Sequence, residues 1–134
     1  MKTKSFFHSY AVLLLMALPF CMLSSGCKKE NQNAIPFSID LSNSTYSALN
    51  TPGAYLYNAN VVIARINATT FAALSEYCTK DNNTVGYNAS IGFFVCSGCG
   101  GRFNLDGTVA FGPPPKALTK YHTSLSGSIL TVSQ

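Results

Sequence analysis

Apolar and polar residues alternate along much of the chain after residue 36, as expected for short strands with one buried face. Residues 37–41 (FSIDL) show this alternation clearly, and further strands are predicted at 54–58, 61–66, 71–77, 84–88, 91–95, 102–109, 119–125 and 128–132. By periodicity the segment 71–77 fits a short helix or a strand, and its place between strands favours a strand. No long helix or internal repeat is visible. The pattern therefore predicts an all-β fold, a small sandwich or barrel of short antiparallel strands.

Turn residues separate these strands. Residues 58–60 (NAN) tolerate positive φ and join two strands, 106–107 (DG) predict a tight hairpin turn, and 126–127 (SG) predict the turn of the last hairpin. Residues 112–115 (GPPP) cannot lie inside a sheet, because prolines offer no N–H groups to the ladder. A stiff, exposed loop is predicted there.

The first 26 residues have a different pattern. Lys2 and Lys4 precede an apolar run at 10–23, which is shorter than the ~20 residues that a membrane-spanning helix needs. This pattern is typical of a secretory signal peptide. Small residues then lead to Cys27, and the segment resembles the lipobox of bacterial lipoproteins, in which the cysteine is lipidated and becomes the mature N-terminus. The alternative is an ordinary cleaved signal peptide followed by an incidental cysteine.

The lipobox resemblance implies a domain organisation and a location. We expect a signal peptide at 1–26, a lipidated Cys27 with a polar tether at 27–35, and one domain at 36–134. The membrane is then a partner through the lipid, and the domain faces the periplasm of a bacterial cell envelope. Lys28 stands where an aspartate would resemble an inner-membrane retention signal, which favours the outer membrane.

Composition argues against several classes of function. The chain has 134 residues, of which only 10% are charged, and two of its nine basic residues lie in the signal peptide. No basic stripe remains to neutralise phosphates, so nucleic acid is not an expected partner. The sequence also contains no Ser-His-Asp set, no suitably spaced pair of carboxylates and no phosphate-binding glycine loop. A stand-alone enzyme is therefore not expected.

Three of the five cysteines belong to the predicted domain: Cys78, Cys96 and Cys99. An odd number cannot close entirely into intramolecular disulfides, which favours a metal site or one bridge plus a free thiol. Cys78 ends one predicted strand, and residues 96–101 (CSGCGG) follow the next hairpin, so both loops return to the same end of the sheet. Glycine-rich loops that carry thiols can surround a metal and donate backbone N–H groups to sulfur.

From residue 61 to 132, the order of strands and cysteine loops resembles the Rieske iron–sulfur domain, with residues 37–66 supplying the first strands. The most specific stretch is 93–114 (FFVCSGCGGRFNLDGTVAFGPP), in which Phe103, the DG turn and the GP loop stand where the family has them. The resemblance implies a two-loop cluster-binding subdomain, a [2Fe–2S] cofactor and one-electron transfer. It also implies a redox protein partner that docks near the two cysteine loops.

The ligand positions depart from the family pattern. Carried over residue by residue, Cys78 and Cys96 fall on the two thiolate ligands, whereas Lys80 and Cys99 occupy the places of the two histidine ligands. The candidate metal ligands are therefore Cys78, Cys96 and Cys99, with Lys80 or Asp81 as a fourth ligand or as a supporting group. Thiolate in place of imidazole adds negative charge, which lowers the expected potential of a cluster toward about −400 mV.

Three hypotheses remain open for this site. The first is an iron–sulfur cluster with altered ligands, and the second is Zn²⁺, because Cys-x-x-Cys with a third cysteine suits structural zinc. The third is a Rieske-fold lipoprotein without a cluster, with a Cys96–Cys99 disulfide and a structural or binding role. His122 lies far along the chain from both loops, and we expect it at the surface or between strands.

Overall fold

The computed structural model describes residues 35–134. The predicted signal peptide at 1–26, the predicted lipid attachment at Cys27 and the tether as far as residue 34 lie outside the described residues. Within residues 35–134, no helix is long and apolar enough to cross a membrane.

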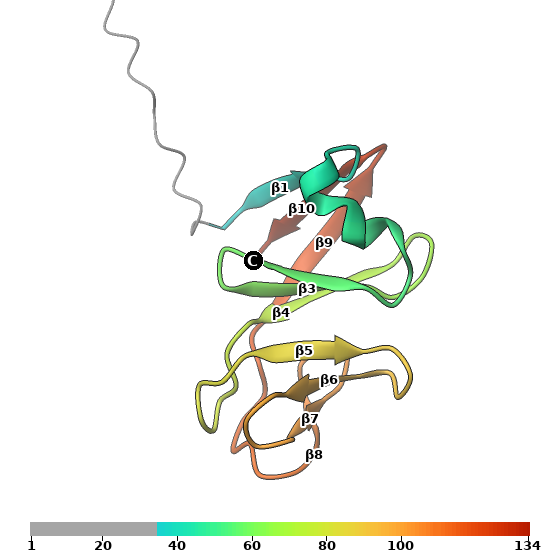
Figure 1. The fold of residues 1–134 in the computed structure, drawn as a ribbon. Coiled ribbons are helices and arrows are strands. Elements are labelled where there is room, and N and C mark those ends of the chain that lie inside the picture. Colours follow the sequence, from blue (N-terminus) through green and yellow to red (C-terminus); the bar gives the residue numbers. More distant parts are fainter. Residues whose placement is uncertain (1–34) are drawn as a thin grey trace, which may run out of the picture.

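Two antiparallel sheets make up the described part of the chain (Figure 1). The six-stranded sheet has the order β1-β10-β9-β4-β3-β2, and the four-stranded sheet has the order β5-β6-β7-β8. The strands of the larger sheet are β1 (Phe37–Asp40), β2 (Tyr55–Asn58), β3 (Val61–Arg65), β4 (Phe71–Ser75), β9 (Lys120–Ser126) and β10 (Ile129–Ser133). Those of the smaller sheet are β5 (Val85–Asn88), β6 (Phe93–Cys96), β7 (Arg102–Phe103) and β8 (Val109–Phe111). The predicted all-β class is confirmed.

The smaller sheet is inserted between two neighbouring strands of the larger one. Strands β4 and β9 pair directly, with Ala73 opposite Tyr121, although β5 to β8 lie between them in the sequence. Figure 1 shows the smaller sheet as a separate layer beside β3 and β4. The connection on each side of the insertion therefore runs from one sheet to the other, and β5 to β8 form a separate subdomain.

Strands β3 and β4 are buried on both faces, which explains their uninterrupted apolar sequence. Val61 and Ile63 pack in the core inside the six-stranded sheet, whereas Val62 and Ala64 pack in the core between the two sheets. The first four residues of β4 are likewise all buried. This burial removes the alternation from the segment 71–77, and the structure confirms a strand over its first five residues, Phe71–Ser75.

The turn predicted at 58–60 is confirmed. Asn58 pairs with Val61 across it, and both Ala59 and Asn60 have positive φ, 52° and 62°. Two left-handed residues in a row match the twist of the flanking strands, which is why such two-residue turns are favoured in hairpins.

Two local features differ from the predictions. A 3-10 helix, η1 (Ser44–Asn50), was not expected; Asn43 caps it by accepting the backbone N–H of Thr45 at 2.9 Å. Its one buried residue, Leu49, joins the core inside the larger sheet. Strand β6 begins at Phe93 instead of residue 91, because Gly92 closes a turn by donating its N–H to the carbonyl of Asn88 at 2.9 Å.

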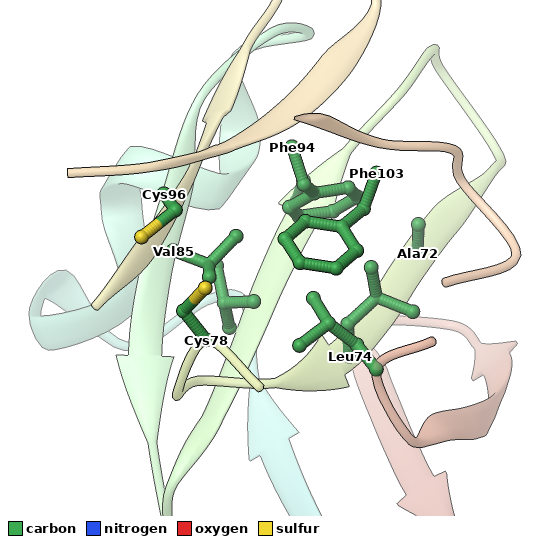
Figure 2. Close-up of a cluster of buried hydrophobic side chains, with 10 residues drawn as sticks. Ala72, Leu74, Cys78, Val85, Phe94, Cys96 and Phe103 are labelled. Carbon is green, nitrogen blue, oxygen red and sulfur yellow. The ribbon is translucent and has the colours of Figure 1, made fainter. Parts of the chain in front are cut away.

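The core between the sheets extends to two of the cysteines (Figure 2). Phe94 of β6 lies opposite Phe103 of β7, and both side chains are fully buried. The figure shows their rings beside Leu74 and Ala72 of β4, with Cys78 and Cys96 on the other side of the cluster near Val85. Both cysteines therefore pack against the apolar core between the sheets.

Candidate metal centre

The loop after β4 reverses immediately beyond Cys78. The N–H of Cys78 donates to the carbonyl of Asn83 at 2.8 Å, and the N–H of Asn82 donates back to the carbonyl of Cys78 at 3.0 Å. Asn82 takes positive φ, 59°, which asparagine tolerates better than most residues. This tight reversal places Asp81 next to Cys78.

The loop after β6 closes in a similar way. The N–H of Cys96 donates to the carbonyl of Gly101 at 2.9 Å, and the N–H of Gly100 donates to the carbonyl of Cys96 at 3.1 Å. The N–H of Cys99 points at Cys96 Sγ at 3.4 Å. Cys99 therefore folds back beside Cys96, and the backbone donates to a sulfur as expected for a thiolate site.

The two loops bring four potential ligands together: Cys78, Asp81, Cys96 and Cys99. One ligand atom from each lies within 4.8 Å of all the others. The sulfurs of Cys78 and Cys99 are 3.7 Å apart, and the thiol of Cys96 donates to Asp81 Oδ1 at 3.3 Å. All three cysteines are free thiols. The convergence of both cysteine loops over one site is thus observed.

Burial acts to raise the pKa values of the Cys78 and Cys99 thiols, whereas hydrogen bonds lower the pKa of Asp81 and of Cys99. Burial raises the pKa of the Cys78 thiol to about 12, whereas the backbone N–H of Asn83 holds the pKa of Asp81 at about 2. Burial also raises the pKa of Cys99, but hydrogen bonds from the Gly101 backbone, Cys96 and Cys78 outweigh it, so the net pKa is lowered. Since metals bind thiolates, an ion at this site would displace the thiol proton of Cys78.

Lys80 and His122 both lie at the surface. Lys80 is exposed, and Asp81, the next residue, supplies the fourth ligand atom of the cluster. His122 is exposed in the middle of β9, opposite Ser133, as expected for a surface residue. Of the two candidates for the fourth position, the structure therefore brings a carboxylate oxygen of Asp81 to the three sulfurs.

The proline loop covers one side of the site. A Cβ built on Gly101 would meet the ring of Pro114, and Thr79 donates its hydroxyl to the carbonyl of Lys116 at 2.7 Å. Pro114 is buried, so the prediction of an exposed loop at 112–115 is wrong for this residue. The reason is the glycine at position 101, which lets the proline ring pack directly on the backbone beside Cys99.

Gly98 allows the two loops to approach each other. A Cβ at this position would lie 2.5 Å from Asp81 Oδ2 and would also overlap the Asn83 amide. Because Gly98 has no positive φ in this structure, alanine suits its backbone and would act only through this overlap.

We expect Gly98→Ala to push the Asp81 carboxylate away from the sulfurs and to lower metal affinity by ~10-fold or more, the scale seen when a group that orients a ligand is lost. Titration with Co²⁺, followed by sulfur-to-metal charge-transfer absorption, measures this affinity. Ser97→Ala is the control, because Ser97 is exposed in the same loop and its hydroxyl contacts Thr84 at 3.4 Å instead of Asp81 or a cysteine. Equal affinities for the two variants would show that metal binding does not depend on the position of Asp81.

The donor set suits a thiophilic ion. Three thiolates and one carboxylate provide the four ligands that zinc or iron takes in tetrahedral sites, whereas magnesium and calcium prefer oxygen ligands alone. The chemistry of the residues therefore fits iron or zinc.

Comparison with known proteins supports a Rieske-like fold. No protein-family model matches the sequence, and no curated protein matches it. Among solved structures, the chain is similar to the plasma membrane Rieske protein PetC3 of the cyanobacterium Synechocystis PCC 6803. Identity is 29% and the TM-score 0.50, over 55% of this chain and 76% of that one.

A second similar structure is the ferredoxin of carbazole 1,9a-dioxygenase from Nocardioides aromaticivorans IC177. Here identity is 17% and the TM-score 0.58, over 75% of this chain and 98% of the ferredoxin, a likeness that concerns the fold. Both cysteine loops lie at one end of a subdomain built as the Rieske resemblance implies. The described part of this chain is therefore a Rieske-like domain, in which the residues at the ligand positions are altered.

Proposed function

We propose that this chain is an electron-transfer protein that binds iron through Cys78, Cys96, Cys99 and Asp81. It works at the periplasmic face of a bacterial membrane, to which a lipid on Cys27 attaches it. The observation that carries the proposal is the meeting of three thiols and one carboxylate at the end of a Rieske-like domain.

The protein groups around the site suit a redox centre. Bound iron would supply the one-electron chemistry by alternating between Fe³⁺ and Fe²⁺. Cys78 and Cys96 are only 3% and 1% exposed, so their sulfurs are shielded from water. The N–H of Cys99 donates to Cys96 Sγ and stabilises negative charge on it, and such hydrogen bonds raise the potential of thiolate-bound iron.

A partner can approach from the side of Cys99 and the proline loop. Cys99 is partly exposed, in contrast to the other two cysteines. Phe111, which directly precedes that loop, is 68% exposed, and the Arg102 guanidinium lies 5.7 Å from the centre of its ring. An exposed aromatic residue beside a cation is typical of surfaces that bind another protein. A redox protein is the partner that fits this proposal.

The test is anaerobic purification of the full-length protein. We expect bound iron and visible sulfur-to-iron charge-transfer absorption, which a reductant bleaches and reoxidation restores. A colourless protein without metal, whose mass is two hydrogens below that of the reduced chain, would contradict the proposal and support the Cys96–Cys99 disulfide. A zinc protein would also contradict it, because zinc has no redox chemistry.

A further inference from the structure

We infer that the site holds one metal ion in a tetrahedral environment of three sulfurs and one oxygen, and not the two-iron cluster that the Rieske resemblance implies. The inference rests on the proposed metal binding by the same four residues. It concerns how many ions they hold and which pairs of ligands are neighbours.

Two pairs of ligands are separated by about the edge lengths of one tetrahedron. Metal–sulfur bonds of ~2.3 Å place two sulfurs about 3.8 Å apart around a tetrahedral ion. Cys78 Sγ and Cys99 Sγ are 3.7 Å apart. With a metal–oxygen bond of ~2.1 Å, a sulfur and an oxygen lie about 3.6 Å apart. Cys96 Sγ lies 3.3 and 3.7 Å from the two oxygens of Asp81.

A two-iron cluster requires a different arrangement. Each iron takes two protein ligands, and these point away from the ligands of the other iron, so two separated pairs are needed. The family pattern would place Cys78 and Cys96 on one iron and Cys99 on the other. In this structure, however, Cys78 lies against Cys99, and all four ligand atoms lie within 4.8 Å of one another. The spacing of the four residues does not fit a [2Fe–2S] cluster.

Contacts between the loops maintain the compact arrangement. The N–H of Ser97 donates to the carbonyl of Thr84 at 3.0 Å, which joins the base of one loop to the other. Closer to the ligands, Asp81 and Asn83 lie against Gly98 where a Cβ would not fit. Opening the loops for a larger cofactor would break these contacts.

The first experiment measures the composition of the centre in the anaerobically purified, full-length protein. We expect about one metal ion per chain and no acid-labile sulfide, as for a single tetrahedral site. Two irons with inorganic sulfide would overturn the inference and leave the proposed function standing. One zinc would support a single-ion site and overturn electron transfer. Absence of metal would overturn both.

The second experiment tests the oxygen ligand. Chelator-treated protein is titrated with Co²⁺, whose d–d absorption reports tetrahedral geometry. Asp81→Asn is expected to lower Co²⁺ affinity by ~10- to 100-fold, since loss of a group that only orients a ligand already has this effect. Asn can keep the turn in which Asp81 accepts the N–H of Asn83 at 3.1 Å.

Asp106→Asn is the matched control, because Asp106 accepts the N–H of Thr108 in the same kind of turn, at 3.0 Å, outside the site. Its Co²⁺ affinity should equal that of the unmodified protein. Octahedral spectra, or an Asp81→Asn variant that binds Co²⁺ as tightly as the control, would overturn the assignment of three sulfurs and one oxygen.

Discussion

Replacing Cys96 with serine is expected to remove the bound metal, with a loss of affinity of at least ~100-fold, because changes in groups that merely support a ligand already cost ~10- to 100-fold. Cys96 ends β6, is almost fully buried, and lies in hydrogen-bond contact with both Asp81 and the backbone of Cys99. A serine hydroxyl stays protonated at neutral pH and is a poor ligand for a thiophilic ion. Metal analysis and the charge-transfer absorption of the purified variant provide the measurement.

Lys80→Ala is the matched control for this variant. Lys80 lies in the other loop and is exposed, and its ammonium group cannot bind a metal unless it loses its proton, so the variant should retain its metal. Its positive charge acts on the centre from a distance, and its removal is expected to lower the reduction potential of bound iron. Retention of metal by Cys96→Ser, or its loss from Lys80→Ala, would mean that the site has been assigned to the wrong residues.

Phe103→Ala is expected to lower the free energy of unfolding by ~3–5 kcal/mol, the usual cost of removing a large buried aromatic side chain. Phe103 is fully buried opposite Phe94, in the core that joins the two sheets. Its loss leaves a cavity that β6 and β7 cannot close without moving. Urea unfolding, followed by circular dichroism, measures the effect as a lower midpoint with an unchanged slope.

Phe111→Ala controls for the change of residue type. Phe111 lies on the neighbouring strand β8 but is largely exposed, and the Arg102 guanidinium lies beside its ring. We expect a loss of at most ~1 kcal/mol, the scale of an exposed cation–π contact. Similar losses for the two phenylalanines would contradict the view that the inter-sheet core stabilises the smaller sheet.

The strand pattern was largely predictable because most strands have one buried face. Alternation located β1 and β10, and turn residues located the hairpins. The doubt over 71–77 arose where alternation disappears, since β4 packs against a core on each side. The missed 3-10 helix is short and has one buried residue, so its only signal in the sequence was Asn43 at its cap.

The sequence was enough to predict which residues are candidates for the site, but not how they are arranged in space. Spacing alone brought Cys78 to the same end of the sheet as Cys96 and Cys99, because a hairpin of two short strands returns the chain to its start. The choice between Lys80 and Asp81 could not be made from the sequence. It depends on the reversal at Asn82, which turns Asp81 toward the sulfurs.

By itself the sequence determined the all-β class, the three cysteines available for a metal and the absence of histidine from the positions that define a Rieske centre. These properties depend on local alternation and on residue identity, which can be read along the chain. Only the tertiary structure decided that Asp81 lies beside the three cysteines, with all four potential ligand atoms within 4.8 Å of one another. Those properties depend on how closely two loops approach each other, and that distance is set by packing at Gly98 and Gly101 between segments far apart in the chain.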